Sequence, residues 1–186
     1  MTSWTLEQRI CRLEDREQIR ELIARYGFAV DDRDLSKIVD CFTKDGAFRS
    51  LDGAMDARGR DAVIAQFHDR FAVLGPSNHF THDLILQFDD LDADRATGLV
   101  SSHAEVVRND RAMWAAIRYH DQYRREDGAW RFRERLLAFF YYVSPGDYAQ
   151  LLGNPQRNRA YAEPRPADLP EALPTWQAYY AAHPRR

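Results

Sequence analysis

The chain has 186 residues, 45% of them hydrophobic, and its 26 basic and 29 acidic side chains give a net charge of -3. This composition predicts one globular domain and excludes a wholly disordered chain, and the balanced charge argues against nucleic acid as a partner. No apolar run approaches the roughly 20 residues that a membrane span needs. Cys11 and Cys41 are too few for a disulfide scaffold. We therefore expect a soluble, cytoplasmic protein with no nucleic-acid or membrane partner.

The first part of the chain has the spacing of helices. Thr5, with a glutamine three places on, forms a capping-box pattern, and apolar residues then recur every three or four positions to about Asp31. Asp34 is placed to cap a further short helix, which the pair Asp45-Gly46 should end. The sequence therefore predicts at least two helices before residue 47.

The middle of the chain changes to the period of strands. Residues 47–51 and 54–58 are short segments flanked by glycines, which predicts a small hairpin. A further helix is predicted over residues 63–74, closed by Gly75-Pro76. Apolar and polar residues then alternate between turn signals, which predicts a meander of four long antiparallel strands over residues 80–88, 99–107, 113–125 and 130–143.

Residues 144–186 differ in composition from the rest, because they hold seven of the eight prolines. We interpret them as a proline-rich C-terminal arm that wraps a domain formed by residues 1–143. Helices followed by a hairpin, a helix and a long meander define an α+β fold class. The expected architecture is a cone-shaped α+β barrel, with N-terminal helices packed in a curved, mostly antiparallel sheet and an open mouth.

Several common site motifs are absent. No lysine follows a glycine, which excludes a P-loop, and neither Gly-x-Gly-x-x-Gly nor Gly-x-Ser-x-Gly occurs. His79, His82 and Asp83 could suggest a metal site, but residues three apart on a strand point to opposite faces. We therefore expect no metal centre.

Three polar positions are candidates for chemistry, and each could equally be ordinary surface. Asp31 begins an acidic stretch at the C-terminal end of a helix, where the helix dipole disfavours carboxylates, so the stretch either serves a site or solvates a turn. His79 begins a strand directly after a loop, and His103 lies in the middle of another. Facing the inside of a cone, either histidine would line a pocket; facing outward, it would be ordinary surface.

Several segments of the chain resemble one family. Residues 19–48, Arg-Gly-Arg at 58–60, His-Phe-Thr-His at 79–82 and residues 125–132 are similar to the SnoaL-like branch of the nuclear transport factor 2-like superfamily. The resemblance covers about residues 8–140. It implies the cone of helices and curved sheet. It leaves the function open, because members include polyketide cyclases, ketosteroid isomerases and dehydratases, and some bind without catalysis.

The resemblance also implies roles for individual residues. Asp31 matches the aspartate that pairs with a histidine in the dehydratases and in hexachlorocyclohexane dehydrochlorinase, and His79 matches the histidine that acts there as base. His103 matches the second histidine of scytalone dehydratase. Tyr26 matches a pocket tyrosine of bile-acid 7α-dehydratase. Arg135 matches a pocket arginine of the dehydrochlorinase and is therefore the expected substrate-binding residue.

This set of residues is chemically coherent as a catalytic site. An imidazole with a pKa of about 6.5 suits removal of a proton next to an activating group, and a carboxylate such as Asp31 fixes its tautomer. His103 or Tyr26 would then protonate a departing hydroxyl or polarise a carbonyl, and Arg135 would hold an anionic or carbonyl group. Val30 and Phe48 stand where scytalone dehydratase has two tyrosines that hold a water, which argues against that substrate.

The favoured function is a cofactor-independent lyase or isomerase of the dehydratase type. Its substrate would be a small hydrophobic ring compound such as a steroid, a polyketide or an aromatic metabolite. The alternative is a non-catalytic small-molecule binding or assembly protein, including the role of dioxygenase beta subunits. Asp31 within hydrogen-bond reach of His79 would favour the enzyme, whereas a pocket filled by the aromatic residues 139–142 would favour the alternative.

The aromatic residues of the meander also predict assembly. They offer more aromatic surface than one core readily covers, which favours a homo-oligomer, most simply a dimer or trimer. The arm would lie along a neighbouring subunit or close the pocket mouth, anchored by Trp176 and Tyr180. The aromatic residues concerned are Trp114, Tyr119, Tyr123, Phe139 and Phe140.

Overall fold

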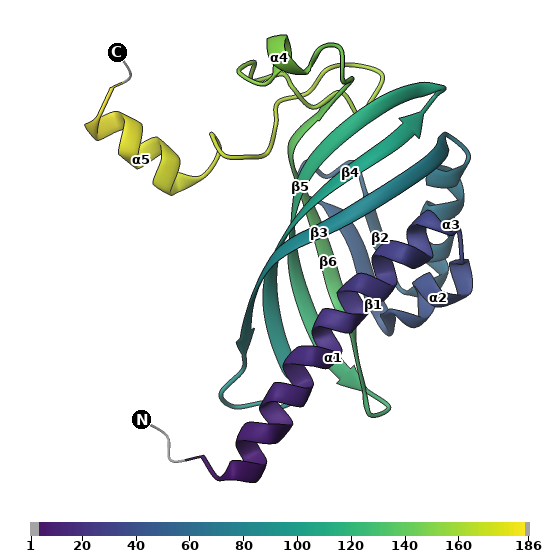
Figure 1. Ribbon diagram of the computed structural model, residues 1–186, viewed down its shortest axis with the longest axis vertical. Helices are drawn as coiled ribbons and strands as arrows, with labels where there is room; N and C mark the ends of the chain where they lie inside the picture. Colours follow the sequence, from purple (N-terminus) through teal and green to yellow (C-terminus); the bar gives the residue numbers. More distant parts are fainter. Residues whose placement is uncertain (1–3, 185–186) are drawn as a thin grey trace.

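A computed structural model describes residues 4–184 as helices packed against one curved, six-stranded sheet (Figure 1). The elements in chain order are α1 (Leu6–Asp31), α2 (Leu35–Asp40), β1 (Phe42–Ser50), β2 (Asp56–Arg58), α3 (Arg60–Phe71), β3 (Leu74–Phe88), β4 (Arg95–Arg108), β5 (Arg111–Glu126), β6 (Ala129–Val143), α4 (Tyr148–Leu151) and α5 (Pro174–Ala182). The strand order is β2-β1-β6-β5-β4-β3, and all neighbours are antiparallel except β1 and β6, which are parallel. The predicted α+β class with a mostly antiparallel sheet is confirmed.

The shape follows from the length of the last four strands. Strands β3 to β6 have 14 to 16 residues each, and strands of that length twist enough for the sheet to curl. Figure 1 shows α1, α2 and α3 together on one side of the curved sheet, with α5 apart from them. No helix within residues 4–184 combines the length and the apolar character that crossing a membrane requires.

Helix α1 begins at the predicted capping box and continues without a break. The backbone N–H of Gln8 donates to Thr5 Oγ1 at 3.2 Å, and the backbone N–H of Thr5 donates to Gln8 Oε1 at 2.9 Å. The first turns extend beyond the sheet, since Leu6 is 70% and Leu13 65% exposed. The second half packs against the sheet and buries Ile19, Leu22, Ile23, Tyr26, Ala29 and Val30.

The predicted helix stop at Asp45-Gly46 is wrong. Helix α2 already ends at Asp40, and both residues lie within β1, where its register with β6 shifts between Phe42 and Ala47. A Cβ on Gly46 would lie only 2.9 Å from the Cβ of Phe42 and 3.0 Å from the backbone oxygen of Phe132. The glycine thus permits a close approach at a strand irregularity and does not end a helix.

The predicted closure of the third helix at Gly75-Pro76 is wrong for a similar reason. Helix α3 ends at Phe71, and the two residues belong to the start of β3. A Cβ on Gly75 would lie 3.2 Å from Val107 Cβ on the neighbouring strand. Proline is tolerated there because β3 is the edge strand of the sheet.

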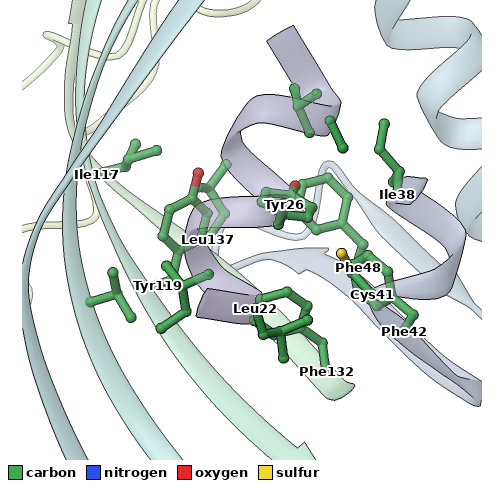
Figure 2. Packing of buried hydrophobic residues seen from close by; sticks show 14 of the residues in the cluster. Leu22, Tyr26, Ile38, Cys41, Phe42, Phe48, Ile117, Tyr119, Phe132 and Leu137 are labelled. Carbon is green, nitrogen blue, oxygen red and sulfur yellow. The ribbon is translucent and has the colours of Figure 1, made fainter. Parts of the chain in front are cut away.

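A cluster of aromatic rings lies in the core where α1 and α3 meet the sheet. Tyr26 contacts Phe132 with ring centroids 5.5 Å apart, and Phe48 stacks on Phe67 at 5.2 Å. Figure 2 shows Tyr26 beside Phe48 and above Phe132, where α1 meets the sheet. Phe67 and Phe132 have no exposed surface. This cluster fixes α1 and α3 to the sheet and so forms the floor beneath any site in the cone.

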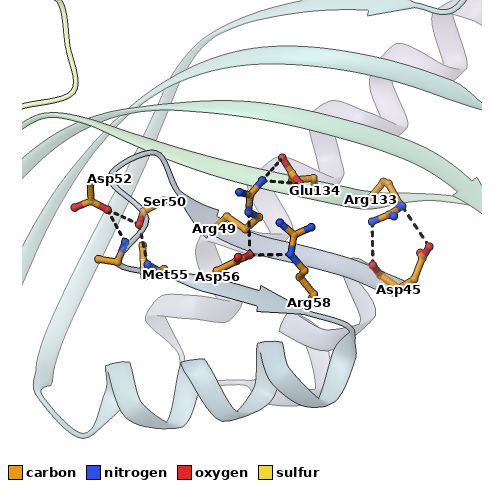
Figure 3. Close-up of polar contacts among 10 residues, drawn as sticks. Asp45, Arg49, Ser50, Asp52, Met55, Asp56, Arg58, Arg133 and Glu134 are labelled. Carbon is orange, nitrogen blue, oxygen red and sulfur yellow. Dashed lines mark hydrogen bonds and ion pairs between the residues drawn. The ribbon is translucent and has the colours of Figure 1, made fainter. Parts of the chain in front are cut away.

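Ion pairs link β1 to both of its neighbours (Figure 3). Arg49 lies 2.9 Å from Asp56, its register partner on β2, and 3.3 Å from Glu134 on β6. Arg133 on β6 pairs with Asp45 at 3.3 Å. Half-exposed pairs of this kind contribute about 1 kcal/mol at most, so we interpret them as support for strand register.

The chain after β6 folds back onto the cone. Asn158 bridges Tyr142 of β6, and the buried Arg157 donates to the backbone oxygens of Phe140 and Leu169 at 2.7 and 2.5 Å. Arg157 also pairs with Glu171 at 2.7 Å. Helix α5 has no buried residue. Within one chain the arm is therefore anchored by Arg157 and Leu169, and anchoring by Trp176 and Tyr180 along a neighbouring subunit stays a prediction.

The aromatic core allows a direct test of this packing. Replacing Phe67 by alanine should lower the free energy of unfolding by about 3–5 kcal/mol, because the side chain is fully buried and a cavity would remain. The matched control is Phe28→Ala, since Phe28 on α1 is 72% exposed and its loss should cost about 0.5 kcal/mol or less. Urea denaturation measures both, and equal losses would contradict the packing described.

Candidate active site

The last residue of α1 meets β3 through a short carboxylate–imidazole contact. Nδ1 of His79 lies 2.6 Å from Oδ1 of Asp31, and the backbone N–H of His79 donates to Oδ2 of the same carboxylate at 2.8 Å. Both side chains are 14% exposed. Two residues separated by 48 positions in the sequence thus form one unit.

Two further side chains hold this carboxylate in place. The hydroxyl of Ser77 donates to Asp31 Oδ1 at 2.7 Å, and Arg33 donates to Ser77 Oγ at 3.0 Å. Arg33 also donates to the backbone oxygens of Val30 and Gly75. Its φ of 61° is left-handed, and this turns the chain between α1 and α2 so that the guanidinium points back to β3.

These contacts decide the protonation state of the carboxyl group. Burial alone would raise the pKa of Asp31, but the hydrogen bonds and charge of His79, together with the hydrogen bond from Ser77, outweigh burial and lower the pKa. Asp31 is therefore ionised at neutral pH and accepts the proton of Nδ1. Nε2 of His79 is left as the nitrogen that can take a proton from another molecule.

His79 lines a cavity of about 500 Å³ between the inner face of the sheet and α3. The wall is mainly apolar, with several aromatic rings and alanines, and its size suits a small ring compound. Ala160 and Tyr161 of the arm complete the lining. The aromatic and aliphatic side chains of the wall include Tyr26, Val30, Phe48, Tyr119, Leu137 and Phe139.

The arm is tied down beside the mouth of this cavity. Asp52, in the turn between β1 and β2, accepts hydrogen bonds from Ser50 at 2.5 Å and from Tyr161, and Arg165 lies 3.5 Å from it. Figure 3 shows Asp52 with Ser50 and the turn leading to Met55. The arm of the same chain thus closes one side of the site, which is one of the two positions predicted for it.

Tyr26 lies in the wall of the cavity and is only 5% exposed. Burial, reinforced by the neighbouring Tyr119, raises the pKa of its phenol, although the charge of Arg135 opposes this. Tyr26 is therefore a neutral O–H donor at any ordinary pH. The structure brings it to the same cavity as His79, as the resemblance implied.

Arg135 lies underneath the cavity and does not line it. Its Nε and Nη2 lie 3.1 Å from the two carboxylate oxygens of Asp121, and both side chains are essentially unexposed. The guanidinium also stacks on Tyr119 at 3.9 Å and on Tyr26 at 4.5 Å. Contrary to the expectation from the resemblance, Arg135 is therefore not placed to contact a substrate directly. It lies outside the cavity lining, and its guanidinium is already paired with the carboxylate of Asp121.

His103 lies on the opposite face of the sheet, so the expectation that it shares a cavity with Asp31 and His79 is wrong. Its Nε2 is 2.5 Å from the hydroxyl of Tyr141, and it faces a groove on the outer side. Ala104, the next residue, faces the cavity. Since strand residues alternate between faces, His103 must point away.

His82 also lies outside, with its ring centroid 5.9 Å from that of His103, so His79 and His82 do point to opposite sides as the strand spacing predicted. Within residues 4–184, no three side chains of the types that ligate metals gather into a group that could hold an ion.

Four residues of the site were missed from the sequence: Ser77, Arg33, Asp121 and the α3 residue Arg70. Ser77 precedes His79 by two positions, and this spacing could have placed both on one face of a strand. Arg33 and Arg70 gave no comparable signal, because isolated arginines are usually solvent-exposed.

Comparison with known proteins places this geometry in a family. The model of the SnoaL-like domain matches residues 11–136, and the chain therefore belongs to the SnoaL-like family. A gamma-hexachlorocyclohexane dehydrochlorinase from Sphingobium indicum is 24% identical over 140 residues, which cover 71% of this chain and 85% of that protein.

Solved structures share the fold. A candidate scytalone dehydratase from Novosphingobium aromaticivorans is 17% identical with a TM-score of 0.65, covering 72% of this chain and 89% of its own. A candidate aromatic ring hydroxylase from the same species is 25% identical with a TM-score of 0.65, covering 74% of this chain and 97% of its own. The chain is thus a member of the nuclear transport factor 2-like superfamily in fold as well as in sequence.

The buried pair beneath the cavity can be tested separately from activity. Arg135→Leu leaves the carboxylate of Asp121 buried without its partner and should lower the free energy of unfolding by about 3–5 kcal/mol in urea denaturation. The double variant Asp121→Asn with Arg135→Leu removes both charges and should recover most of that loss. If the double variant is as unstable as Arg135→Leu, the pair does not have this structural role.

Proposed function

We propose that the protein is a cofactor-independent lyase or isomerase of the dehydratase type, with His79 as general base. The observation that carries the proposal is the 2.6 Å contact between His79 and Asp31 at the wall of an apolar cavity of about 500 Å³. A carboxylate-paired imidazole is a base suited to neutral pH, and an apolar cavity suits a hydrophobic substrate.

In the proposed reaction, Nε2 of His79 removes a proton from a carbon next to an activating group, such as a carbonyl group or a carbon that carries the leaving group. The electron pair of the broken C–H bond forms a double bond, and in an elimination a hydroxyl or other leaving group departs from the adjacent carbon with its own bonding pair. Asp31 stabilises the imidazolium. Tyr26 is the donor for the departing group, since His103 lies on the other face. In an isomerisation, the imidazolium returns the proton to another carbon.

The relatives support an elimination. Both a dehydrochlorinase and a dehydratase remove a small acid or water from a substrate, and the names of two similar proteins carry those activities. The proposed substrate is a small hydrophobic ring compound of the steroid, polyketide or aromatic type. Val30 and Phe48 line the cavity where tyrosines were expected for scytalone, which disfavours scytalone itself.

The alternative is a non-catalytic binding or assembly role, such as that of a dioxygenase beta subunit. The similarity to a candidate aromatic ring hydroxylase is the observation that favours it. Phe139 and Tyr142 do line the cavity, as this alternative requires, but they leave about 500 Å³ unfilled. The open cavity and the paired histidine together favour the enzyme.

The catalytic proposal is tested by variants of the pair. Wild-type protein is screened for chloride release from gamma-hexachlorocyclohexane and for water loss from β-hydroxy ketones of ring compounds, followed by the absorbance of the conjugated product. Asp31→Asn and His79→Ala should each lower the turnover that is found by about a hundredfold or more, because general base catalysis supplies at least that much. His82→Ala, on the outer face, is the control and should retain activity. Near wild-type rates in folded Asp31→Asn or His79→Ala protein would refute the assignment.

We also propose a homo-oligomer, dimer or trimer. Of the five aromatic residues that suggested it, Tyr119, Tyr123 and Phe139 are buried within one chain, and the case depends on outer-face side chains. Phe80 is 44%, Ile85 61% and Trp114 36% exposed there.

Sedimentation of the full-length protein at micromolar concentration measures its state of assembly. The expected mass is two or three times 21.7 kDa. A single species of monomer mass would contradict the proposed assembly.

A further inference from the structure

Helix α3 brings two unpartnered donors to the cavity wall opposite the sheet. Gln66 and Arg70 are four residues apart, so they lie on one face of the helix, and both line the same cavity as His79. Nε2 of Gln66 and Nε of Arg70 are buried and have no hydrogen-bond partner. Buried donors are nearly always satisfied, so these two mark a part of the cavity wall where the chain supplies few acceptors.

The charge of Arg70 also lacks a counterion. Its Nη1 lies 3.0 Å from the sulfur of Met55, which is a weak acceptor, and its guanidinium stacks near Phe48. Within residues 4–184, no carboxylate oxygen lies within 4.0 Å of it. By contrast, the fully buried Arg135 and Arg157 are each paired with a carboxylate.

Other charged groups of the cavity do not compensate Arg70. Asp56 is paired with Arg49 and Arg58 at 2.9 Å each. Asp69 is exposed at the rim, and Arg108 is a second cation, hydrogen-bonded to Tyr142. On α3 itself, Asp69 and Arg70 carry opposite charges, but Asp69 is exposed to solvent, so the partly buried Arg70 is the group available to a bound anion.

Arg70 is also close enough to influence the catalytic end of the cavity. Burial lowers the pKa of the Arg33 guanidinium, Asp31 opposes this, and the charge of Arg70 lowers it further. Arg70 and His79 therefore line the same cavity from different elements, α3 and β3.

We infer that Arg70 and Gln66 bind the carboxylate of a ring compound whose apolar body fills the cavity. The guanidinium and the amide supply N–H donors from one helix face, which suits the two oxygens of a carboxylate. The place of the reacting carbon near His79 rests on the proposed function, whereas carboxylate binding by α3 does not. The natural ligand is thus expected to be a hydrophobic ring acid.

The test uses 2-naphthoate and its neutral counterpart 2-naphthamide as probes in isothermal titration calorimetry of the full chain. Wild-type protein should bind the carboxylate at least about tenfold more tightly than the amide. Arg70→Met should lower the affinity for 2-naphthoate by about tenfold or more, because the charge-assisted hydrogen bonds of the guanidinium are lost. It should change the affinity for 2-naphthamide by less than about threefold, because methionine keeps the apolar part of the arginine side chain. Gln66→Leu should have a smaller effect of the same kind. Arg118→Met, which removes a cation from the outer face of β5, is the matched control.

Two further measurements distinguish a ligand-binding arginine from a structural one. Ligand-free Arg70→Met should have a melting temperature equal to or above that of wild type, since it removes a partly buried cation without an ion pair, whereas loss of a structural arginine would lower it. Arg70→Lys keeps the charge and should lose only part of the affinity if the methionine variant does not fold.

The binding and catalytic proposals can fail separately. His79→Ala should still bind 2-naphthoate, so loss of the catalytic assignment would leave carboxylate binding intact. Equal affinity of wild type for both probes, unchanged 2-naphthoate affinity in Arg70→Met, or no binding of 2-naphthoate at millimolar concentration would each overturn the inference.

Discussion

The carboxylate of Asp31 is the point on which the site depends. It accepts hydrogen bonds from the backbone and ring of His79 and from the hydroxyl of Ser77, and so joins the end of α1 to the start of β3. A carboxylate at a helix C-terminus is disfavoured by the helix dipole. The three donors outweigh that cost, and the same contacts that hold the two elements together orient the imidazole toward the cavity.

Arginines in and below the cone show how this protein handles buried charge. Arg135 is neutralised by Asp121 and Arg157 by Glu171, and each of these pairs secures a structural element, the floor and the arm respectively. Among the described residues, Arg70 and Arg108 line the cavity without an ion pair, and Arg70 has a thioether and aromatic rings as its neighbours. A cation without an ion pair is unfavourable in an apolar wall, so we attribute Arg70 to binding of an anionic ligand and not to stability of the fold.

The arm gives the cavity its closed side. Its segment around Arg157 adds backbone contacts to the end of β6, and this places Ala160 and Tyr161 in the cavity wall. The hydrogen bond between Tyr161 and Asp52 then ties the arm to the turn after β1. The volume of the cavity is therefore set jointly by the cone and by a segment outside the part of the chain that the SnoaL-like family model matches.

The sequence alone predicted the α+β class, the helix from the capping box at Thr5, the four-strand meander and, through the family resemblance, the pairing of Asp31 with His79. Local periodicity and turn residues are sufficient to predict these helices and strands. The sequence could not show that Gly46 and Gly75 lie within strands and do not end helices. Each permits a close contact with a neighbouring segment, and that contact depends on tertiary packing. Nor could the sequence decide which histidine faces inward. His79 lies opposite Ala104, whereas His103 lies opposite Phe80, so the register between β3 and β4 places the first in the cavity and the second outside. Alternation along one strand gives two faces, and only the closed sheet determines which of them is the inside.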